Sequence, residues 1–470
     1  MDVLAPLRRR SDAPTRRVDA DLVVLGVEVV LVAAAVAVGV LLNARGVGLH
    51  ADAAPLYATW RPHLGWGTPA ALLVAAGVIG WGVRWGRTAG WGRLLVGAYL
   101  AAVAWTMSLA LVDGWSAGLT RRLTPQAEYL HEVLRVTDVT AMLAGFSARI
   151  LDFQAEAWST HTAGHPPGAL LVFVGLDRIG LGGPTVAALA CVLMGATVSV
   201  SVPVTLRALG AEESARRVLP FLVLLPGAVW VGVSADGIFA GVVAAGLALL
   251  AVRGLVAAAV GGLLLGFALY LSYGFVLVGV LALAVVALRS RDRCAALLAA
   301  LAGVVAVVAT FTLAGFWWLD GYHLVVQRYH QGWAADRPYA YWVWANMAAL
   351  LLCGGPVLGP ALRRAALAAA GPSRTAATRW RGSVRPPLIA WSAVLRGAGP
   401  TVLLPLAAAL AVGAADLSGL SKAEVERIWL PFVVWLLVAA AHLPPSVRRF
   451  WLAGQALTAL AVSHLLWTVS

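Results

Sequence analysis

The chain has 470 residues, of which 61% are hydrophobic and 12% are charged, and its mean hydropathy is +0.84. Soluble globular proteins carry about 25% charged residues, so this composition excludes that class. The formal net charge of +13 comes from arginines in short segments between apolar runs. That pattern is typical of membrane topology and not of nucleic-acid binding. The three cysteines have no CxxC spacing and indicate neither a metal site nor a disulfide framework.

Apolar runs of near 20 residues recur along the whole chain, and each is long enough to cross a hydrocarbon core of roughly 30 Å. We therefore predict an all-α, polytopic membrane protein with about thirteen transmembrane helices and a long outer loop that carries membrane-surface helices. The predicted transmembrane ranges are 21–43, 67–85, 94–113, 183–208, 214–234, 236–252, 254–271, 273–289, 294–317, 341–362, 398–415, 428–444 and 449–468.

These helices divide the chain into six parts. They are a basic cytoplasmic tail (1–20), N-terminal transmembrane helices (21–112), an outer loop (113–182), a transmembrane core with a second outer loop at 318–340 (183–362), a cytoplasmic linker (363–397) and C-terminal transmembrane helices (398–470). With the N-terminus inside, 24 of the 35 basic residues fall in inside segments. This bias follows the positive-inside rule and supports the orientation.

The run 166–181 is the one apolar stretch whose path changes the topology. If it crossed the membrane, every later loop would change sides, and the charge bias would be reversed downstream. A helix over this run is only about 24 Å long, and Asp177 and Arg178 interrupt its end. We expect it to lie along the outer membrane surface.

Two aspartates are predicted at outer helix ends. Asp113 closes the third helix, and Asp236 opens the sixth. An ionisable group beside the membrane is a functional candidate, although Asp113 could simply end its helix in the headgroup zone. Ser234 or Asp236 could likewise act as an N-cap. The location of both aspartates on one membrane face favours a shared site.

The outer loop itself supplies further candidates. His165 precedes Pro166 and Pro167, and His161 lies one helical turn earlier. A histidine here could serve a phosphate as a cation or as a hydrogen-bond donor. His161, His165 and Glu156 could also form a metal cluster, but the chain lacks HExxH or Cys/His spacing.

Other polar residues fall in the same predicted outer segments. Arg121 and Arg122 are an arginine pair on the outer face, where the positive-inside rule makes them unusual, so an anionic ligand such as a lipid phosphate is expected. Arg427 at a late helix start is a second phosphate candidate, or a local ion pair with Glu426. Possible substrate-binding residues are Glu128, Tyr129, His161, Tyr322 and His323.

The order of these features resembles the GT-C superfamily of membrane glycosyltransferases, in the branch of protein O-mannosyltransferases and lipid A aminoarabinose transferases. The matching motifs are Asp113-Gly114 after an early helix, His165-Pro166-Pro167-Gly168-Ala169-Leu170-Leu171 at a surface helix, and Ala235-Asp236-Gly237-Ile238 at a later helix start. The small-residue helix from Gly262 to Tyr273 also looks like the family's. Asp-Gly stands where the family usually has Asp-Glu, and histidine stands where lysine usually precedes Pro-Pro.

The resemblance implies transfer of a sugar, of mannose or arabinose type, from a polyprenyl-phosphate donor to an acceptor hydroxyl. In this interpretation Asp113 is the general base and Asp236 a second catalytic acid. His165, Arg427, Arg121 and Arg122 would bind the donor phosphate. No cofactor is expected, a divalent metal is not excluded, and the acceptor is a glycan, a lipid or a protein. The resemblance also implies a reaction at the outer face of the cytoplasmic membrane, and the high Ala, Arg and Trp content with a single lysine suggests a GC-rich bacterial genome.

Two other interpretations of the sequence stay open. A transporter or a flippase for lipid-linked sugars would show polar residues near helix centres, broken helices in paired positions and an inverted repeat. A non-catalytic subunit of an envelope machine would place Asp113 and Asp236 far apart, with no cavity between them.

Overall fold

The computed structural model describes residues 13–232, 234–379 and 398–468. Within these ranges the protein is almost entirely helical, and its only sheet has two short strands. The predicted basic tail lies mostly outside the described residues, as does the second half of the predicted linker 363–397. The first half of that linker is helical, because α19 extends over Leu358–Arg379.

Six helical segments among the described residues are long and apolar enough to cross a membrane. They are Ala20–Ala44 in α1 (Ala13–Ala44), Gly67–Thr88 from α2 to α3, α4 (Trp91–Ala110), Pro184–Ala208 over α9 and α10, α16 (Arg293–Leu313) and α21 (Pro400–Leu417). The protein is therefore an all-α membrane protein. Thirteen crossings remain a prediction, since four further apolar helices are shorter: Asp236–Ala251, Leu255–Leu269, Tyr273–Leu288 and Leu430–His442.

Two predicted helices are broken in the structure. The run 214–234 divides into α11 (Glu212–Val223) and α12 (Ala228–Val231), with Pro226 and Gly227 between them. The run 341–362 divides into α18 (Tyr339–Gly354) and α19, which meet at 95°. Gly355 has φ +86°, a left-handed conformation that ends helices, and Pro356 cannot donate a helical hydrogen bond.

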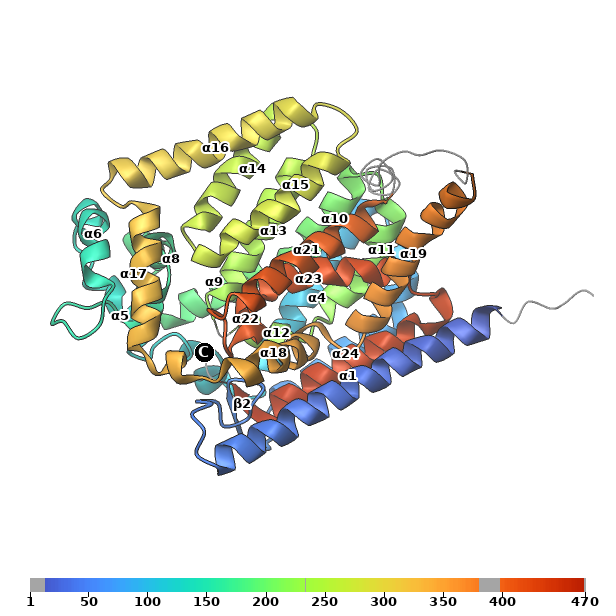
Figure 1. Ribbon diagram of the computed structural model, residues 1–470, viewed down its shortest axis with the longest axis horizontal. Coiled ribbons are helices and arrows are strands. Elements are labelled where there is room, and N and C mark those ends of the chain that lie inside the picture. The colour runs from blue at the N-terminus through green and yellow to red at the C-terminus, as the bar shows by residue number, and fades with distance from the viewer. Residues whose placement is uncertain (1–12, 233, 380–397, 469–470) are drawn as a thin grey trace, which may run out of the picture.

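Helix α13 (Asp236–Ala251) is buried over almost its whole length, with 14 of its 16 residues buried. Its neighbours are α9 (Pro184–Ala196), α10 (Val198–Ala208), α14 (Leu255–Leu269), α15 (Val278–Leu288) and α23 (Leu430–Leu436). Figure 1 shows α13 near the middle of the bundle, between α1 and α16 on opposite sides of the view. The first residue of α13, Asp236, is thus held by the core of the fold.

Short helices gather at one end of the bundle, which we call the loop end (Figure 1). They are α5 (Leu130–Val133), α6 (Val139–Gly145), α7 (Thr160–Gly164), α8 (Pro167–Arg178), α17 (Trp318–Gln331) and α22 (Val425–Ile428). The helix α8 is about 18 Å long, too short to cross a bilayer, and its place along a membrane surface remains a prediction. The second outer loop was predicted without a helix, but α17 fills most of it.

A small β-ribbon joins two distant parts of the chain at the loop end. Strand β1 (Ala58–Trp60) pairs antiparallel with β2 (Leu466–Thr468), and Thr59 lies opposite Trp467. The predicted last helix, 449–468, therefore ends earlier, as α24 (Arg448–Leu465). The ribbon ties the segment between α1 and α2 to the end of the described chain.

Candidate functional site

Arg427 is the centre of the main polar group at the loop end. It is 6% exposed. One terminal nitrogen donates to Asp236 Oδ2 at 3.0 Å, and the other donates to Glu424 Oε2 at 2.5 Å. Burial alone would lower the pKa of Arg427, but Glu424 and Asp236 outweigh it and raise the pKa. Arg427 is therefore a permanent cation clamped between two carboxylates.

Asp236 reaches this cation from the start of α13. Its side chain is buried. The N-cap position of α13 is Ala235, which makes no side-chain cap hydrogen bond, so Asp236 is the first helical residue and not the cap. Ser234 Oγ donates instead to the carbonyl of Trp230 at 3.0 Å. Neither residue is thus an N-cap, and Asp236 instead forms an ion pair with a residue 191 positions away.

Glu424 is shared between two arginines. Its Oε1 accepts from Arg337 at 3.1 Å while its Oε2 accepts from Arg427. Burial would raise the pKa of Glu424, but Arg427 and Arg337 lower it to about 2. Both Glu424 and Ala423 have positive φ, 63° and 66°, a conformation that is costly for residues with a side chain. Two adjacent strained residues at this point mark a backbone that the surrounding structure holds in place.

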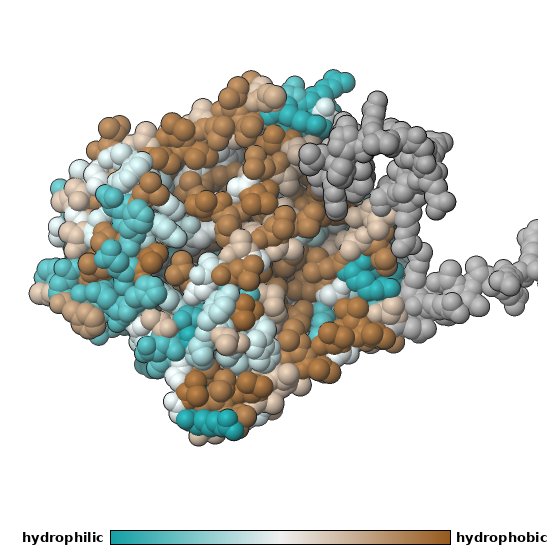
Figure 2. Space-filling model, viewed as in Figure 1, coloured by the Kyte–Doolittle hydropathy of each residue, from teal (hydrophilic) through white to brown (hydrophobic). Residues whose placement is uncertain are grey.

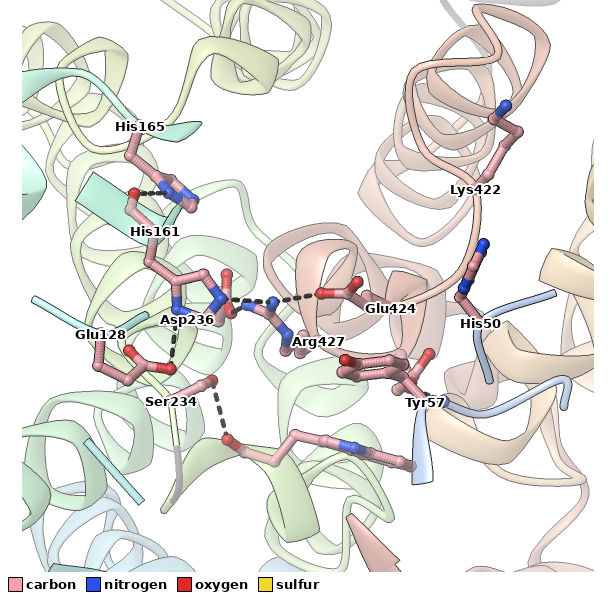
Figure 3. Close-up of polar contacts among 12 residues, drawn as sticks. His50, Tyr57, Glu128, His161, His165, Ser234, Asp236, Lys422, Glu424 and Arg427 are labelled. Atoms are coloured by element: carbon pink, nitrogen blue, oxygen red, sulfur yellow. Dashed lines mark hydrogen bonds and ion pairs between the residues drawn. The ribbon is translucent and has the colours of Figure 1, made fainter. Parts of the chain in front are cut away.

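Lys422, the only lysine of the chain, fixes the strained turn from the other side. Its Nζ donates to the carbonyls of Ala335 and Arg337, both at 2.8 Å. Arg337 returns a bond to the Lys422 carbonyl at 2.6 Å. Figure 3 shows Lys422, His50 and Tyr57 on one side of Arg427 and Glu424, with His161 and Asp236 on the other.

The opposite side is formed by a histidine and a buried glutamate of the outer loop. His161 Nδ1 lies 2.8 Å from Glu128 Oε1, and the Glu128 side chain is 3% exposed. A carboxylate only accepts, so Nδ1 carries the proton and Nε2 keeps a lone pair in the neutral ring. His161 Nε2 lies 3.5 Å from Arg427. We call Asp236, Glu424, Arg427, Glu128 and His161 the Arg427 cluster.

His165 lies beside this cluster but is not a cation. Its Nδ1 donates to the His161 carbonyl at 2.9 Å. Burial lowers the pKa of His165 to about 4, although Asp236 acts to raise it. The ring is neutral at pH 7, so the predicted role as a positive charge for a phosphate does not fit its surroundings.

Asp113 lies in a different group, with residues that the sequence did not link to it. Its Oδ1 is 2.6 Å from His63 Nε2, and its Oδ2 accepts from Arg122 at 2.7 Å. The Nδ1 of His63 faces the Arg61 carbonyl at 2.7 Å. Both ring nitrogens of His63 therefore face acceptor oxygens. We call Asp113, His63 and Arg122 the Asp113 cluster.

The Asp113 cluster is built onto the β-ribbon. The indole ring of Trp467 lies between two guanidinium groups, 4.6 Å from that of Arg61 and 4.4 Å from that of Arg122. Arg122 also donates to the Thr468 carbonyl. The two clusters lie at the same end of the bundle, because α4, which precedes Asp113, packs against α12, which precedes Asp236. Among the described residues, no hydrogen bond or ion pair joins Asp113 to Asp236 or His165, so these residues belong to two separate polar groups, and a site shared by them remains a prediction.

The other predicted residues lie at different distances from these clusters. Tyr129 is buried and stacks on Phe173, with its ring 6.1 Å from that of His161. Arg121 is exposed. Tyr322 stacks on Trp318, away from Arg427. His323 is exposed and lines an open cavity beside α17.

The metal interpretation of the outer loop finds no geometry to support it. Glu156 pairs with Arg135 at 2.9 Å, not with the histidines. No group of three or more His, Cys, Asp or Glu suited to a metal ion occurs among the described residues.

Sequence reasoning missed Glu424, Arg337 and His63. Glu424 precedes Arg427 by three residues, the spacing of neighbours on a helix, and this signal was available in the sequence. The predicted local partner, Glu426, instead accepts from the backbone N–H of Tyr57 at 2.9 Å. Arg337 and His63 gave no signal, because their partners lie 87 and 50 positions away.

No protein-family model, curated protein or solved structure matches this chain. The geometry alone therefore indicates what the site can do. The Arg427 cluster combines a buried cation, which can balance a developing negative charge, with a carboxylate-oriented histidine, which can accept a proton.

Proposed function

We propose that the protein is a membrane glycosyltransferase that moves a sugar, of mannose or arabinose type, from a polyprenyl-phosphate donor to an acceptor hydroxyl. The observation that carries this proposal is the Arg427 cluster, a buried cation beside an oriented histidine at one end of an apolar helical bundle. The order of the Asp113, His165 and Asp236 motifs, which resembles the GT-C superfamily, supports it. A lipid donor needs no nucleotide-binding motif.

In this reaction the acceptor oxygen attacks the anomeric carbon, and the bond from that carbon to the phosphate oxygen breaks. The polyprenyl phosphate leaves with the bonding electrons, and the acceptor hydroxyl gives up its proton. We assign that proton to Nε2 of His161, because Glu128 holds Nδ1, and the only group facing Nε2 among the described residues is the Arg427 guanidinium at 3.5 Å, a contact that the acceptor would have to replace. Asp236 orients Arg427 and is not needed as the proton acceptor.

The leaving phosphate requires positive charge close to the breaking bond. Arg427 supplies it, and its Nε has no hydrogen-bond partner among the described residues. Lys422 is half-buried and uses two of its three N–H bonds on carbonyls, so one remains for a ligand. Glu424 keeps both arginines in position until the phosphate arrives.

This assignment moves the general base from Asp113 to His161. Both oxygens of Asp113 are already engaged, one by His63 and the other by Arg122, so neither is open to an acceptor hydroxyl. If His161 is the base, His161→Gln should lose transfer and Asp113→Asn should keep it. If Asp113 is the base, the two variants should give the reverse results.

The test is sugar transfer by the purified protein in lipid nanodiscs, with radiolabelled polyprenyl-phosphate mannose and arabinose as donors and isolated cell-envelope glycan as acceptor. We expect His161→Gln to lower kcat by roughly 10²–10⁴-fold. His131→Gln is the matched control, since His131 is an exposed histidine of the same loop. Full turnover in the His161 variant, with loss in Asp113→Asn, would return the base to Asp113.

A transporter or flippase is the second candidate, favoured by the bend between α18 and α19. Broken helices are common at transporter substrate sites. Glu28 of α1 reaches this bend and accepts from the N–H of Gly359 at 2.6 Å, and Asp21 pairs with Arg363 and Arg364. A flippase would move a lipid-linked sugar across vesicles with no acceptor present, and would do so unchanged in His161→Gln.

A further inference from the structure

The helix α17 has two faces with opposite surroundings. Successive residues turn by about 100° around a helix, so Trp318, Tyr322 and Tyr329 share one face, and Asp320, His323 and Gln327 lie on the other. The aromatic face is anchored, since Trp318 Nε1 donates to the Leu269 carbonyl at 2.8 Å and its ring stacks on Tyr322. The polar face is left without such partners.

An open cavity of about 500 Å³ lies against that polar face. Ser147 contributes to the opposite wall, together with alanine and leucine side chains. Within the described part of the chain, no hydrogen bond or ion pair engages the side chains of Ser147, Asp320, His323 or Gln327. The volume falls in the range of roughly 300–1,000 Å³ that is typical of small-molecule sites.

The lining selects the chemistry of a ligand. Asp320 offers only acceptors, whereas Ser147, His323 and Gln327 each offer a donor and an acceptor. A hydroxyl group both donates and accepts hydrogen bonds. The cavity lining therefore matches neutral polyhydroxy compounds. No arginine or lysine lines the cavity, and Asp320 would repel a phosphate or a carboxylate. Figure 2 shows hydrophilic residues gathered at this end of the molecule, where α17 and α6 lie, against a largely hydrophobic remainder.

The cavity is connected to the Arg427 cluster through the packing of two helices. The helix α17 packs against α7, and α7 carries His161. A further bond, from the Asp152 backbone N–H to Gln331 Oε1 at 2.8 Å, fixes the end of α17 to the segment that follows Ser147. A ligand in the cavity would therefore lie at the loop end, on the same side as the proposed proton acceptor.

We infer that the cavity between α17 and residues 147–151 is a saccharide-binding subsite that holds the acceptor glycan. Binding of a neutral saccharide follows from the lining alone. The role as acceptor site rests on the proposed glycosyl transfer.

Saturation-transfer NMR on the full chain in nanodiscs tests the binding, with methyl α-mannopyranoside, methyl α-arabinofuranoside and an α-linked mannobiose as probes. We expect each of Asp320→Asn and Gln327→Ala to weaken binding about tenfold, the loss of roughly one hydrogen bond of about 1.4 kcal/mol. The matched controls are Asp336→Asn and His330→Ala, exposed residues of the same region that do not line the cavity. Equal affinities in lining and control variants, or no binding of any probe to the unaltered protein, would overturn the inference.

Transfer assays with the same variants separate this inference from the proposed function. If the lining variants raise KM for the acceptor glycan while kcat and KM for the donor stay unchanged, the cavity is the acceptor site. Transfer with an unchanged acceptor KM overturns the acceptor role and leaves the glycosyltransferase proposal intact. Saccharide binding that needs Asp320, in a protein with no transferase activity, supports the subsite and contradicts the proposed function.

Discussion

The Arg427 cluster and the Asp113 cluster are made of the same residue types at the same end of the bundle, but they leave their histidines in different states. In the first, Glu128 occupies one nitrogen of His161, and the other nitrogen keeps a lone pair. In the second, the backbone carbonyl of Arg61 faces one nitrogen of His63, and the carboxylate of Asp113 faces the other. Of these two histidines, only His161 has a ring nitrogen that faces no acceptor, and this nitrogen lies 3.5 Å from the Arg427 guanidinium, so we place the proposed proton acceptor there.

The two clusters also differ in what they connect. The Arg427 cluster joins the outer loop, the start of α13 and the strained turn at Ala423, which are segments from across the whole chain. The Asp113 cluster joins the end of α4 to a two-stranded ribbon. An aspartate, a histidine and an arginine can therefore form a reaction site or a structural fastening, and the hydrogen-bond partners of the histidine distinguish the two.

The largest effect is expected at Arg427. Arg427→Gln removes the cation that balances the leaving phosphate. It leaves Asp236 buried without its counter-charge and leaves Glu424 with Arg337 alone. We expect kcat to fall by about 10²–10³-fold or more and the free energy of unfolding to fall by roughly 3–5 kcal/mol. Transfer assays and denaturant unfolding measure the two losses. Arg328→Gln, which breaks a more exposed pair with Asp152, is the control.

Glu128→Gln sharpens the comparison at the histidine. An amide NH₂ beside Nδ1 would favour the other tautomer of His161, with the proton on Nε2. We expect kcat to fall about 10²-fold while KM for the donor changes little, measured by initial rates at varied donor concentration. A kcat equal to that of the unaltered protein would show that the Glu128–His161 pair is only structural.

Asp113→Asn should give the reverse pattern. It replaces a carboxylate whose side chain is 11% exposed and which bonds both His63 and Arg122. We expect the free energy of unfolding to fall by about 3 kcal/mol, with kcat of the surviving folded protein within about threefold of the original. Thermal unfolding and transfer rates on the same sample provide the measurement. A 100-fold loss of kcat at unchanged stability would contradict a fastening role.

The two clusters also show which parts of the fold and of the candidate site could be predicted from the sequence. Hydropathy alone predicts an all-α membrane protein, because long apolar runs have few other stable forms. Asp236, His161 and Arg427 were identified as candidates from their predicted sidedness, and the structure brings all three together. Glu128 was also a candidate, and the three-residue spacing from Glu424 to Arg427 was a usable signal, whereas Arg337, 87 positions from Glu424, could not be identified.

The fold departs from the sequence prediction where turn-forming residues lie within apolar runs. Pro226-Gly227 and Gly354-Gly355-Pro356 interrupt two runs that hydropathy treats as continuous, and both are turn signals. The helix α17 was predicted as a loop because its polar residues dominate the composition, although Trp318, Tyr322 and Tyr329 recur at helical spacing. The β-ribbon has three residues in each strand, too few for any alternation to be recognised.

The smallest effect is expected beside the Arg427 cluster, at Glu426. Its side chain is 1% exposed and accepts only from the N–H of Tyr57, leaving Oε2 without a partner among the described residues. Burial raises the pKa of Glu426 to about 7 from 4.5, with the Tyr57 N–H opposing the change. The folded protein therefore keeps this proton at pH values where the unfolded chain has lost it.

Because the folded-state pKa is the higher one, stability is lost as pH rises from about 4.5 through about 7. The loss is at most about 3 kcal/mol above pH 7. Glu426→Gln keeps an acceptor for Tyr57 and carries no charge, so its stability advantage over the unaltered protein should be small at pH 5 and grow by pH 8. Unfolding free energies at both values measure that gap, with Glu156→Gln, a 73% exposed carboxylate, as control. A gap that does not widen would mean that Glu426 is ionised in the fold at pH 5, as a third negative charge beside Arg427.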